Sequence, residues 1–304
     1  MTLQQLRDFL AVLEHGSFRG AARGLGVSQA GLTNSLQALE TSLGSSLLVR
    51  SGRGVTLTDA GQRLQARAVL IDREAQRAAQ EAASALGALN GSLHVGMGPT
   101  PTYLLLPRVV PDFRRRFPQV ALHFTSGLYE RLVPAVQQGL IDFAITSIPE
   151  GALGKDLASS VLLKAEMAVM GRRGHPMADA RSLRALAGCE WILLGSPGVP
   201  GGTITRFFAD NGLGAPRIAA TCESFTQAMA LVGETDALAL LPRALIEQDL
   251  LGPRIAQIHV SERAHRFDVC LVQRSDVPLT PVAAAFAAMC ASCARIVSPL
   301  RPAP

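Results

Sequence analysis

A short segment near the N-terminus, residues 17–29, constrains the fold more than any other part of the chain. Ser17 and Ser28 are good N-caps, because a serine oxygen can accept a hydrogen bond from an unpaired N–H group in the first turn of a helix. Gly26 can adopt the positive φ that ends a helix sharply. The segment therefore predicts a short helix, a glycine stop and a second helix that begins at Ser28.

The second helix has two unlike faces. Leucines at intervals of four, three and four residues, Leu32, Leu36, Leu39 and Leu43, predict one buried stripe. The opposite face of its first turns carries uncharged short or amide side chains, which suit base edges in a major groove. A small helical hairpin explains the leucines but not this amide-rich face. The pattern predicts DNA contacts from Ser28, Gln29, Ala30, Thr33, Asn34 and Gln37.

A predicted hairpin follows this pair of helices. The apolar runs 47–50 and 55–57 flank Ser51-Gly52-Arg53-Gly54, which is typical of a tight turn. Arg50 and Arg53 are placed to contact phosphate or to enter a minor groove. On their own they would fit a solvated hairpin equally well, but beside the helix–turn–helix they predict DNA contacts.

Residues 1–60 resemble the winged helix–turn–helix of the LysR-type transcriptional regulators. The resemblance rests on 18–22 (FRGAA), Ser28-Gln29, Leu39-Glu40, Leu43-Gly44 and 57–61 (LTDAG), and its organisation extends over nearly the whole chain. Two positions depart from the family pattern. Ala30 stands where many relatives have proline, and Asn34 stands where arginine is common. These departures leave the fold unchanged and affect the operator sequence.

Composition agrees with a globular protein of two or three domains and identifies no enzyme class. The chain has 304 residues, 48% of them hydrophobic and 17% charged, with a net charge of +5. Residues 1–60 hold five arginines against four acids, so charge supports nucleic-acid binding only weakly. Without a secretory signal or an apolar run long enough to span a bilayer, a cytoplasmic location with no membrane partner is expected. The five cysteines lack a disulfide or metal-site spacing, and no cofactor or metal is expected.

A long helix is predicted from Thr58 or Asp59 to about Leu89. Its apolar residues alternate at intervals of four and three, as in a heptad seam filled mostly by alanine: Leu64, Ala68, Ile71, Ala75, Ala78, Ala82, Ala85 and Leu89. A helix packed along its own chain is the alternative. A small-residue seam favours close contact between two such helices, antiparallel or parallel. The resulting dimer would carry two recognition helices, which suit the two half-sites of a near-palindromic operator. In the family resembled, this linker helix is the dimerisation element.

After Asn90-Gly91 the pattern changes to strands that alternate with helices. Strands are expected at 93–97, 121–125, 143–146, 167–170, 191–194, 218–221, 237–241 and 267–272, and helices at 102–117, 128–138, 203–211, 225–232 and 282–297. This order implies parallel, doubly wound sheets. The resemblance implies an α/β effector domain of two lobes, of the periplasmic-binding-protein type. Lobe one is expected at about 91–161 and 267–304, and lobe two at about 162–266.

Open α/β sheets bind ligands beyond the carboxyl ends of their strands, and this rule selects a set of hydroxyl groups. The N–H groups and dipole of a helix N-terminus favour an anion there. Ordinary helix caps without a ligand are the alternative for any one residue. The family commonly uses hydroxyls at the positions of Thr100 and Thr102. The expected effector-binding residues are Thr100, Thr102, Ser126, Thr146, Ser196, Thr203 and Phe225.

The expected fold is thus an α+β winged helix–turn–helix (1–60), a linker helix (58–89) and an α/β two-lobed effector domain (91–304). The expected function is transcription regulation modulated by a small effector, an organic acid before an inorganic anion such as sulfate. The expected partners are a double-stranded DNA operator, the acid effector, RNA polymerase and a second copy of the chain in a homodimer. A homotetramer is left open. The alternatives are a cytoplasmic small-molecule-binding protein or an enzyme on the same scaffold. The enzyme alternative is disfavoured because the histidines form no HxxxH or HExxH pattern and no serine lies in a GxSxG motif.

Overall fold

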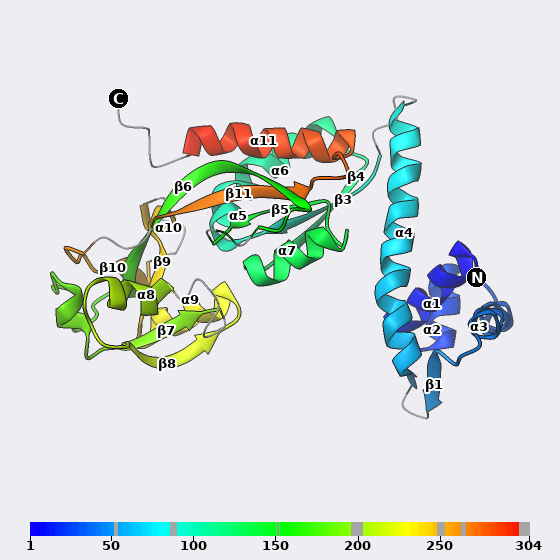
Figure 1. The fold of residues 1–304 in the computed structure, drawn as a ribbon, viewed down its shortest axis with the longest axis horizontal. Coiled ribbons are helices and arrows are strands. Elements are labelled where there is room, and N and C mark those ends of the chain that lie inside the picture. The colour runs from blue at the N-terminus through cyan, green and yellow to red at the C-terminus, as the bar shows by residue number, and fades with distance from the viewer. Residues whose placement is uncertain are drawn as a thin grey trace. The chain divides into compact units, whose positions relative to one another are not determined.

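The structure, a computed structural model, describes residues 1–51, 54–85, 90–149, 151, 153–195, 203–247, 253–262 and 266–297. The chain divides into two compact units (Figure 1). Unit 1 comprises Met1–Ala88 with Gln138–Leu140, and unit 2 comprises Leu89–Gln137 with Ile141–Pro304.

Unit 1 contains a three-helix group, a hairpin and a long helix. Its elements are α1 (Leu3–Glu14), α2 (Phe18–Leu25), α3 (Gln29–Leu43), β1 (Leu48–Ser51), β2 (Gly54–Leu57) and α4 (Asp59–Ala85). The predicted caps are confirmed, because Ser17 accepts from Gly20 N–H and Ser28 from Gly31 N–H. Gly26 ends α2 with a φ of 68°. Helix α1 was not predicted from the sequence.

The core of unit 1 lies between the three short helices and the start of α4. Leu32, Leu36 and Leu39 are buried in it, as the leucine stripe predicts, with Phe9 and Phe18. Leu43 contradicts the prediction, because 40% of its surface is exposed. Leu43 is the last residue of α3, and Gly44 turns the chain away directly after it with a φ of 65°. The buried stripe therefore spans three leucines rather than four.

The joint between the hairpin and α4 requires a glycine. Thr58 donates from its backbone to Leu47 O and from its hydroxyl to Ser46 O, and its hydroxyl accepts from Gly61 N–H. A Cβ at Gly61 would lie 2.1 Å from the Leu47 carbonyl oxygen. The first turn of α4 and the β1 backbone therefore approach each other more closely than any larger residue allows.

Unit 2 alternates strands with helices, as the sequence predicts. Its strands are β3 (Gly91–Met97), β4 (Val120–Ser126), β5 (Phe143–Ser147), β6 (Leu157–Arg172), β7 (Glu190–Leu194), β8 (Arg217–Cys222), β9 (Leu238–Pro242), β10 (Ile255–Gln257) and β11 (Arg266–Arg274). Its helices are α5 (Pro99–Leu104), α6 (Leu106–Arg116), α7 (Tyr129–Gln137), α8 (Thr203–Asp210), α9 (Phe225–Glu234), α10 (Arg243–Glu247) and α11 (Pro281–Val297), with a 3-10 turn at Leu183–Leu186.

One sheet runs through both lobes of unit 2 in the order β4-β3-β5-β11-β6-β9-β7-β8, with β10 beside β6. Strands β3, β4 and β5 are parallel, as are β7, β8 and β9. Strand β6 pairs antiparallel with β11 along Leu157–Glu166 and with β9 along Met167–Met170. The predicted strand 167–170 is thus the end of a sixteen-residue strand that joins the lobes.

The helix predicted at 102–117 is two helices, which is a correction. The chain enters α5 at Pro99, with Gly98 as N-cap, and α6 starts at Leu106. Pro107 explains the break, because it lacks the N–H that would bond to the carbonyl four residues earlier. The 3-10 turn, α10 and β10 are short elements that the sequence pattern did not predict.

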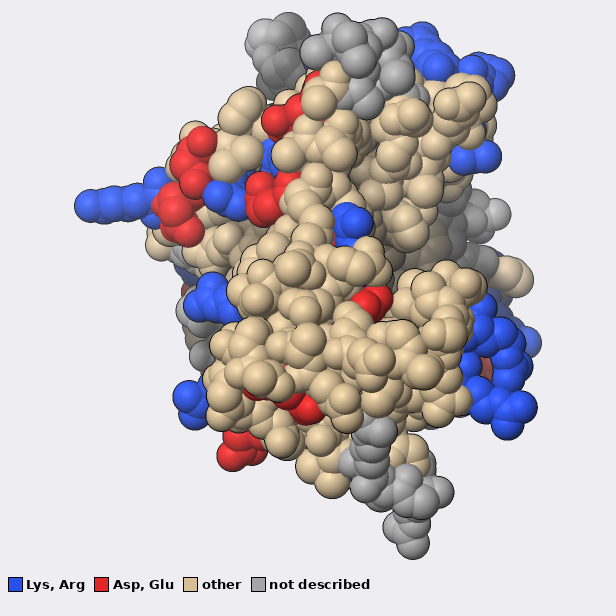
Figure 2. Space-filling model, turned by 90° about the vertical axis from the view of Figure 1, so that its right-hand side faces the viewer, with Lys and Arg blue, Asp and Glu red and all other residues tan. Residues whose placement is uncertain are grey.

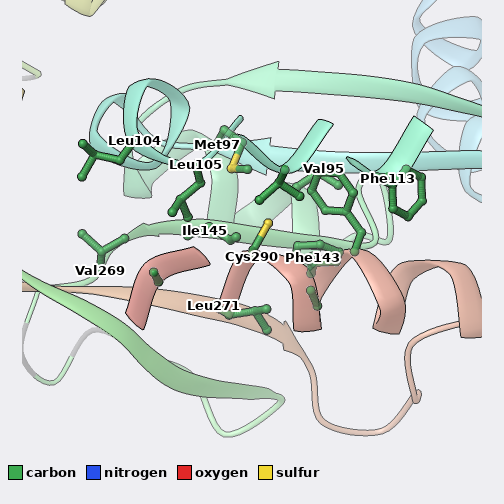
Figure 3. Close-up of a cluster of buried hydrophobic side chains, with 14 of the residues drawn as sticks. Val95, Met97, Leu104, Leu105, Phe113, Phe143, Ile145, Val269, Leu271 and Cys290 are labelled. Atoms are coloured by element: carbon green, nitrogen blue, oxygen red, sulfur yellow. The ribbon is translucent and has the colours of Figure 1, made fainter. Parts of the chain in front are cut away.

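The largest cluster of buried side chains lies under the first lobe's sheet. Figure 3 shows Val95, Met97 and Ile145 from parallel strands packed with Phe143 of β5 and with Cys290 of α11. Separate clusters pack around α9 and around Trp191 in lobe two. Each lobe therefore has its own core. Over the described part of the chain, no helix combines the length and apolarity that a membrane span needs.

We expect Gly61→Ala to destabilise unit 1 by about 2 kcal/mol, because its Cβ would overlap the Leu47 carbonyl and force the α4 joint apart. Chemical denaturation monitored by circular dichroism measures this. Gly188→Ala is the matched control, since a Cβ there has nothing within 4 Å. Equal stability of the two variants would contradict the close approach at the joint.

Candidate nucleic-acid interface and effector cleft

Helix α3 is fixed in unit 1 by a buried carboxylate. Asp8 on α1 is 6% exposed and accepts hydrogen bonds from the Ser35 hydroxyl and, at 2.8 Å, from the Gln4 side chain. Because a buried charge is costly unless it is hydrogen-bonded, these contacts define how α3 lies on α1. The buried leucines and Ser35 hold one side of α3, so the other side faces solvent.

The residues predicted to contact DNA lie on that free side. Ser28, Gln29, Ala30, Asn34 and Gln37 are exposed, and Thr33 is half-buried. The structure brings these six side chains together on the first turns of α3. The Arg50 side chain and the whole of Arg53 lie outside the described residues.

A second carboxylate, Glu40, ties α3 to the hairpin. Its Oε1 atom accepts from Leu47 N–H at 2.7 Å and from Leu48 N–H at 3.3 Å. Strands β1 and β2 pair from Leu48↔Leu57 to Ser51↔Gly54. The hairpin therefore stands beside the exposed face of α3, the arrangement of a winged helix–turn–helix. Leu39-Glu40 is part of the family motif, but its contact with the hairpin could not be derived from the sequence.

The predicted heptad seam on α4 divides into two parts. Ala68 is fully buried, and Leu64 packs on the same cluster of unit 1, so these positions contact their own chain. Arg7 Nε lies 2.6 Å from Asp72 Oδ1 and adds a polar contact between α1 and α4. Further along, Ala75 is half-buried and the seam residues Ile71, Ala78 and Ala82 are exposed. The alternative of a helix packed along its own chain thus holds for the first two seam residues.

In unit 2, three predicted threonines gather around Gly98, at the carboxyl ends of β3 and β5. Gly98 N–H donates to Ile145 O at 2.8 Å. Thr146 is 1% exposed, and its Oγ1 atom has no hydrogen-bond partner among the described residues. A Cβ on Gly98 would lie 3.1 Å from it. Thr100 is also buried. The Thr102 hydroxyl donates to Gly98 O at 2.7 Å, so part of its capacity serves its own helix.

The remaining predicted cleft residues are less tightly grouped. Ser126 is exposed at the end of β4, in register with Met97. Phe225, the first residue of α9, packs edge-on against Tyr103 of α5 at 5.8 Å between ring centroids. Ser196 lies outside the described residues, as does the side chain of Thr203, the first residue of α8.

Two residues beside the predicted effector-binding residues could not be found from the sequence pattern alone. Tyr103 directly follows Thr102, and its contact with Phe225 joins α5 of lobe one to α9 of lobe two. Arg131 on α7 lies with its stem beside Gly127, which directly follows Ser126. The position of Tyr103 beside the threonine pair was a signal in the sequence. For Arg131 no local pattern pointed to the cleft.

On the face that Figure 2 draws, basic side chains do not form one continuous surface. Figure 2 shows lysine and arginine in separate groups, with large uncharged areas between them. This agrees with the near balance of charge in residues 1–60. The arrangement of α3, and not a basic patch, is therefore the structural feature that favours DNA.

Comparison with known families agrees with this arrangement in both units. Residues 3–62 match the family model of the bacterial regulatory helix-turn-helix protein, lysR family. Residues 86–294 match the model of the LysR substrate binding domain. The second match alone covers more than half of the chain.

Relatives of the whole chain carry regulatory names. The SDS degradation transcriptional activation protein of Pseudomonas sp. (strain ATCC 19151) is 30% identical over 93% of each chain. A probable hydrogen peroxide-inducible genes activator of Mycobacterium xenopi is 37% identical, over 59% of this chain and 94% of that protein. The crystal structure of CbnR, a LysR family transcriptional regulator, matches with a TM-score of 0.74 and 25% identity over 97% of this chain and 99% of that one.

The fold, the winged helix–turn–helix and both family matches lead to one conclusion. The chain belongs to the LysR family of DNA-binding transcription regulators and carries that family's effector-binding domain.

Proposed function

We propose that this regulator binds a near-palindromic operator through the exposed face of α3 and acts on transcription by RNA polymerase, without catalytic activity of its own. Asn34 and Gln37 offer amides to base edges, and Gln29, Ala30 and Thr33 shape the same surface. Ser28 caps the helix beside them. Arg50 and Arg53 of the hairpin supply phosphate or minor-groove contacts. The contact of Glu40 with the hairpin supports this arrangement.

Asn34→Ala should relax the preference at one base pair by about 1–3 kcal/mol, because an amide can pair bidentately with adenine. Arg53→Ala is the contrasting variant and should weaken binding to all sequences, lowering the salt slope by about one. Fluorescence anisotropy with a panel of single-base operator variants separates the two effects. An unchanged preference in Asn34→Ala would show that this face of α3 does not contact bases.

We propose that two copies pair through the exposed part of the α4 seam, around Ile71, Ala78 and Ala82. Ile71 is 41% exposed, and Ala78 and Ala82 of the same seam are exposed with it. Small residues let two helices approach closely, and pairing would place two α3 helices on one operator. The proposal concerns the dimer and does not extend to a tetramer.

Ala78→Glu should dissociate the dimer, because like charges would meet in the seam. Ala79→Glu is the matched control, since Ala79 is also exposed on α4 but lies off the seam. Light scattering coupled to size exclusion measures the mass of both variants. If both keep the mass of the unmodified protein, the seam is not the dimer interface.

We propose that the effector is a small organic acid, a carboxylate or sulfonate, held between the lobes. The observation that carries this proposal is the buried Thr146 hydroxyl beside the N-terminus of α5, which finds no partner in the described part of the chain. A buried polar group of this kind is costly and is expected to find a partner in the functional state. Ser126, Thr100, Thr102 and, from lobe two, Ser196 and Thr203 would supply further donors.

Two further features support an acid with an apolar body. The stem of Arg131 lies beside Gly127, which brings a guanidinium within reach of the Ser126 end of the cleft. Tyr103 and Phe225 provide aromatic surface between the lobes. Because these two rings touch each other, a ligand that enters between them must displace the contact. Inorganic sulfate would use the hydroxyls but not the aromatic surface.

Peroxide sensing, suggested by the name of the Mycobacterium xenopi relative, fits this chain less well. A sensor of this kind needs a reactive thiolate, and the segment 191–203 has no cysteine. Burial raises the pKa of all five thiols, to about 12 for Cys290. Thiols with raised pKa values hold less thiolate and react more slowly with peroxide.

Thr146→Val should raise the free energy of unfolding of the unliganded protein by about 1 kcal/mol, because it removes an unpaired buried hydroxyl at constant shape. Thr280→Val is the matched control. Thr280 is also buried, but its hydroxyl accepts from Ala283 N–H, so its loss should destabilise. Urea denaturation of both variants measures the two changes.

The same Thr146→Val variant should lose stabilisation by organic acids. Thermal shifts of the full chain with benzoate, benzenesulfonate, hexanoate and sulfate test this, with benzyl alcohol as the neutral control. We expect at least one organic acid to stabilise the unmodified protein and not the variant. Stabilisation by neutral compounds alone would reject an acid effector and leave the DNA-binding function untouched.

A further inference from the structure

One contact between aromatic rings joins the two lobes of unit 2. Tyr103 of α5, in lobe one, meets Phe225 of α9, in lobe two, with 5.8 Å between ring centroids and 60° between ring planes. Every other ring contact among the described residues lies within a single lobe or within unit 1. Separation of α5 from α9 therefore breaks a ring contact.

Tyr103 reaches from lobe one onto the core of lobe two. The buried side chains of that core cluster all belong to lobe two, and in the described part of the chain Tyr103 is the one residue of lobe one packed against them. The other half-buried side chains packed on the cluster are Leu194, Phe225, Met229 and Ile246. Because these side chains are only half-buried, apolar surface stays open beside the two rings.

Each ring is attached to a different part of the effector cleft. Tyr103 directly follows Thr102, whose hydroxyl donates to Gly98 O at 2.7 Å, so its ring belongs to the same short helix as the predicted threonines. Phe225 begins α9 directly after Ser224, which forms a capping box with Gln227. The Tyr103 ring therefore moves with the hydroxyl groups of lobe one, and the Phe225 ring moves with lobe two.

A ligand body that enters between these rings must replace the contact that it breaks. Ring pairs are stabilised beyond the area that they bury, because the negative face of one ring attracts the positive edge of another. An aromatic body restores this attraction with both rings, whereas a saturated body of similar size restores only the buried area. The two rings therefore favour an aromatic body, and the thickness of that body holds α5 away from α9.

We infer, on the basis of the acid-binding function proposed for the cleft, that the effector is an aromatic acid whose ring takes the place of the contact between Tyr103 and Phe225. Its acid group binds beside Thr146 in lobe one, and its ring contacts both lobes. Occupancy separates α5 from α9, and β6 and β11, which pass between the lobes, follow that separation.

Calorimetric titration of the full chain with four matched compounds separates the role of the ring from that of the charge. The compounds are phenylacetate, cyclohexylacetate and the two corresponding amides. We expect the affinity for phenylacetate relative to cyclohexylacetate to fall about threefold to tenfold in Tyr103→Leu and in Phe225→Leu, because a ring contact is lost. Comparing this ratio between proteins cancels the greater apolarity of the saturated ring.

Two further variants serve as controls. Tyr103→Phe keeps the ring and should keep the ratio. Phe124→Leu removes a partly exposed ring that packs on Phe286 within lobe one, and it should also leave the ratio unchanged. Fluorine NMR of the unmodified chain labelled with 3-fluorotyrosine gives a readout that needs no leucine variant. Its Tyr103 resonance, identified by its absence in Tyr103→Phe, should shift with phenylacetate.

The outcomes distinguish the inference from the function on which it rests. An unchanged ratio in both leucine variants, or an unshifted Tyr103 resonance at saturation, would overturn the inference, while tighter binding of the acids than of the amides would still support an acid effector. Equal affinities for acids and amides, with the ratio falling as expected, would reject the acid and keep the selection of an aromatic body. No binding of phenylacetate would overturn the inference, and hexanoate then tests the acid effector by itself.

Discussion

The pairing of β6 with β11 and β9 is the constraint on which the effector-binding unit depends. Because β6 pairs with β11 in lobe one and with β9 in lobe two, both lobes share one hydrogen-bonded sheet. A change in the angle between the lobes must bend β6 and β11, while each lobe keeps its own core. A ligand that binds one lobe orientation better than another therefore shifts the population of the whole unit. The proposed effector site, between the lobes, acts on this joint.

The DNA-binding fold could be predicted from the sequence because its signals are local. Ser17, Gly26 and Ser28 specify helix ends within a few residues, and the leucine stripe of α3 is a property of one helix. The long-range contacts could not be predicted. Asp8 and Glu40 have their partners on other elements, and nothing in their immediate neighbours identifies those partners. Leu43 shows the limit of periodicity, since a helix end can continue the pattern after the core has ended.

The effector-binding residues were partly predictable, because some of their signals are also local in the sequence. The rule that ligands bind at the carboxyl ends of strands selected Thr146 and Thr100, and both are buried beside Gly98. The break before α6 was also encoded in the sequence, by Pro107, but the apolar periodicity across it concealed the signal. The packing of Tyr103 on Phe225 joins segments far apart in the chain, and the pairing of β6 with β11 depends on strand register. Such features follow from tertiary structure and not from local sequence.

If a small acid bound between the lobes controls how the regulator binds DNA, the affinities for acid and operator must be linked thermodynamically. Titration calorimetry would measure the affinity of the acid for the free protein and for the protein saturated with its operator. We expect the two affinities to differ by the same factor by which the acid changes operator affinity in an anisotropy titration. Equal acid affinity in the free and DNA-bound states would contradict this linkage.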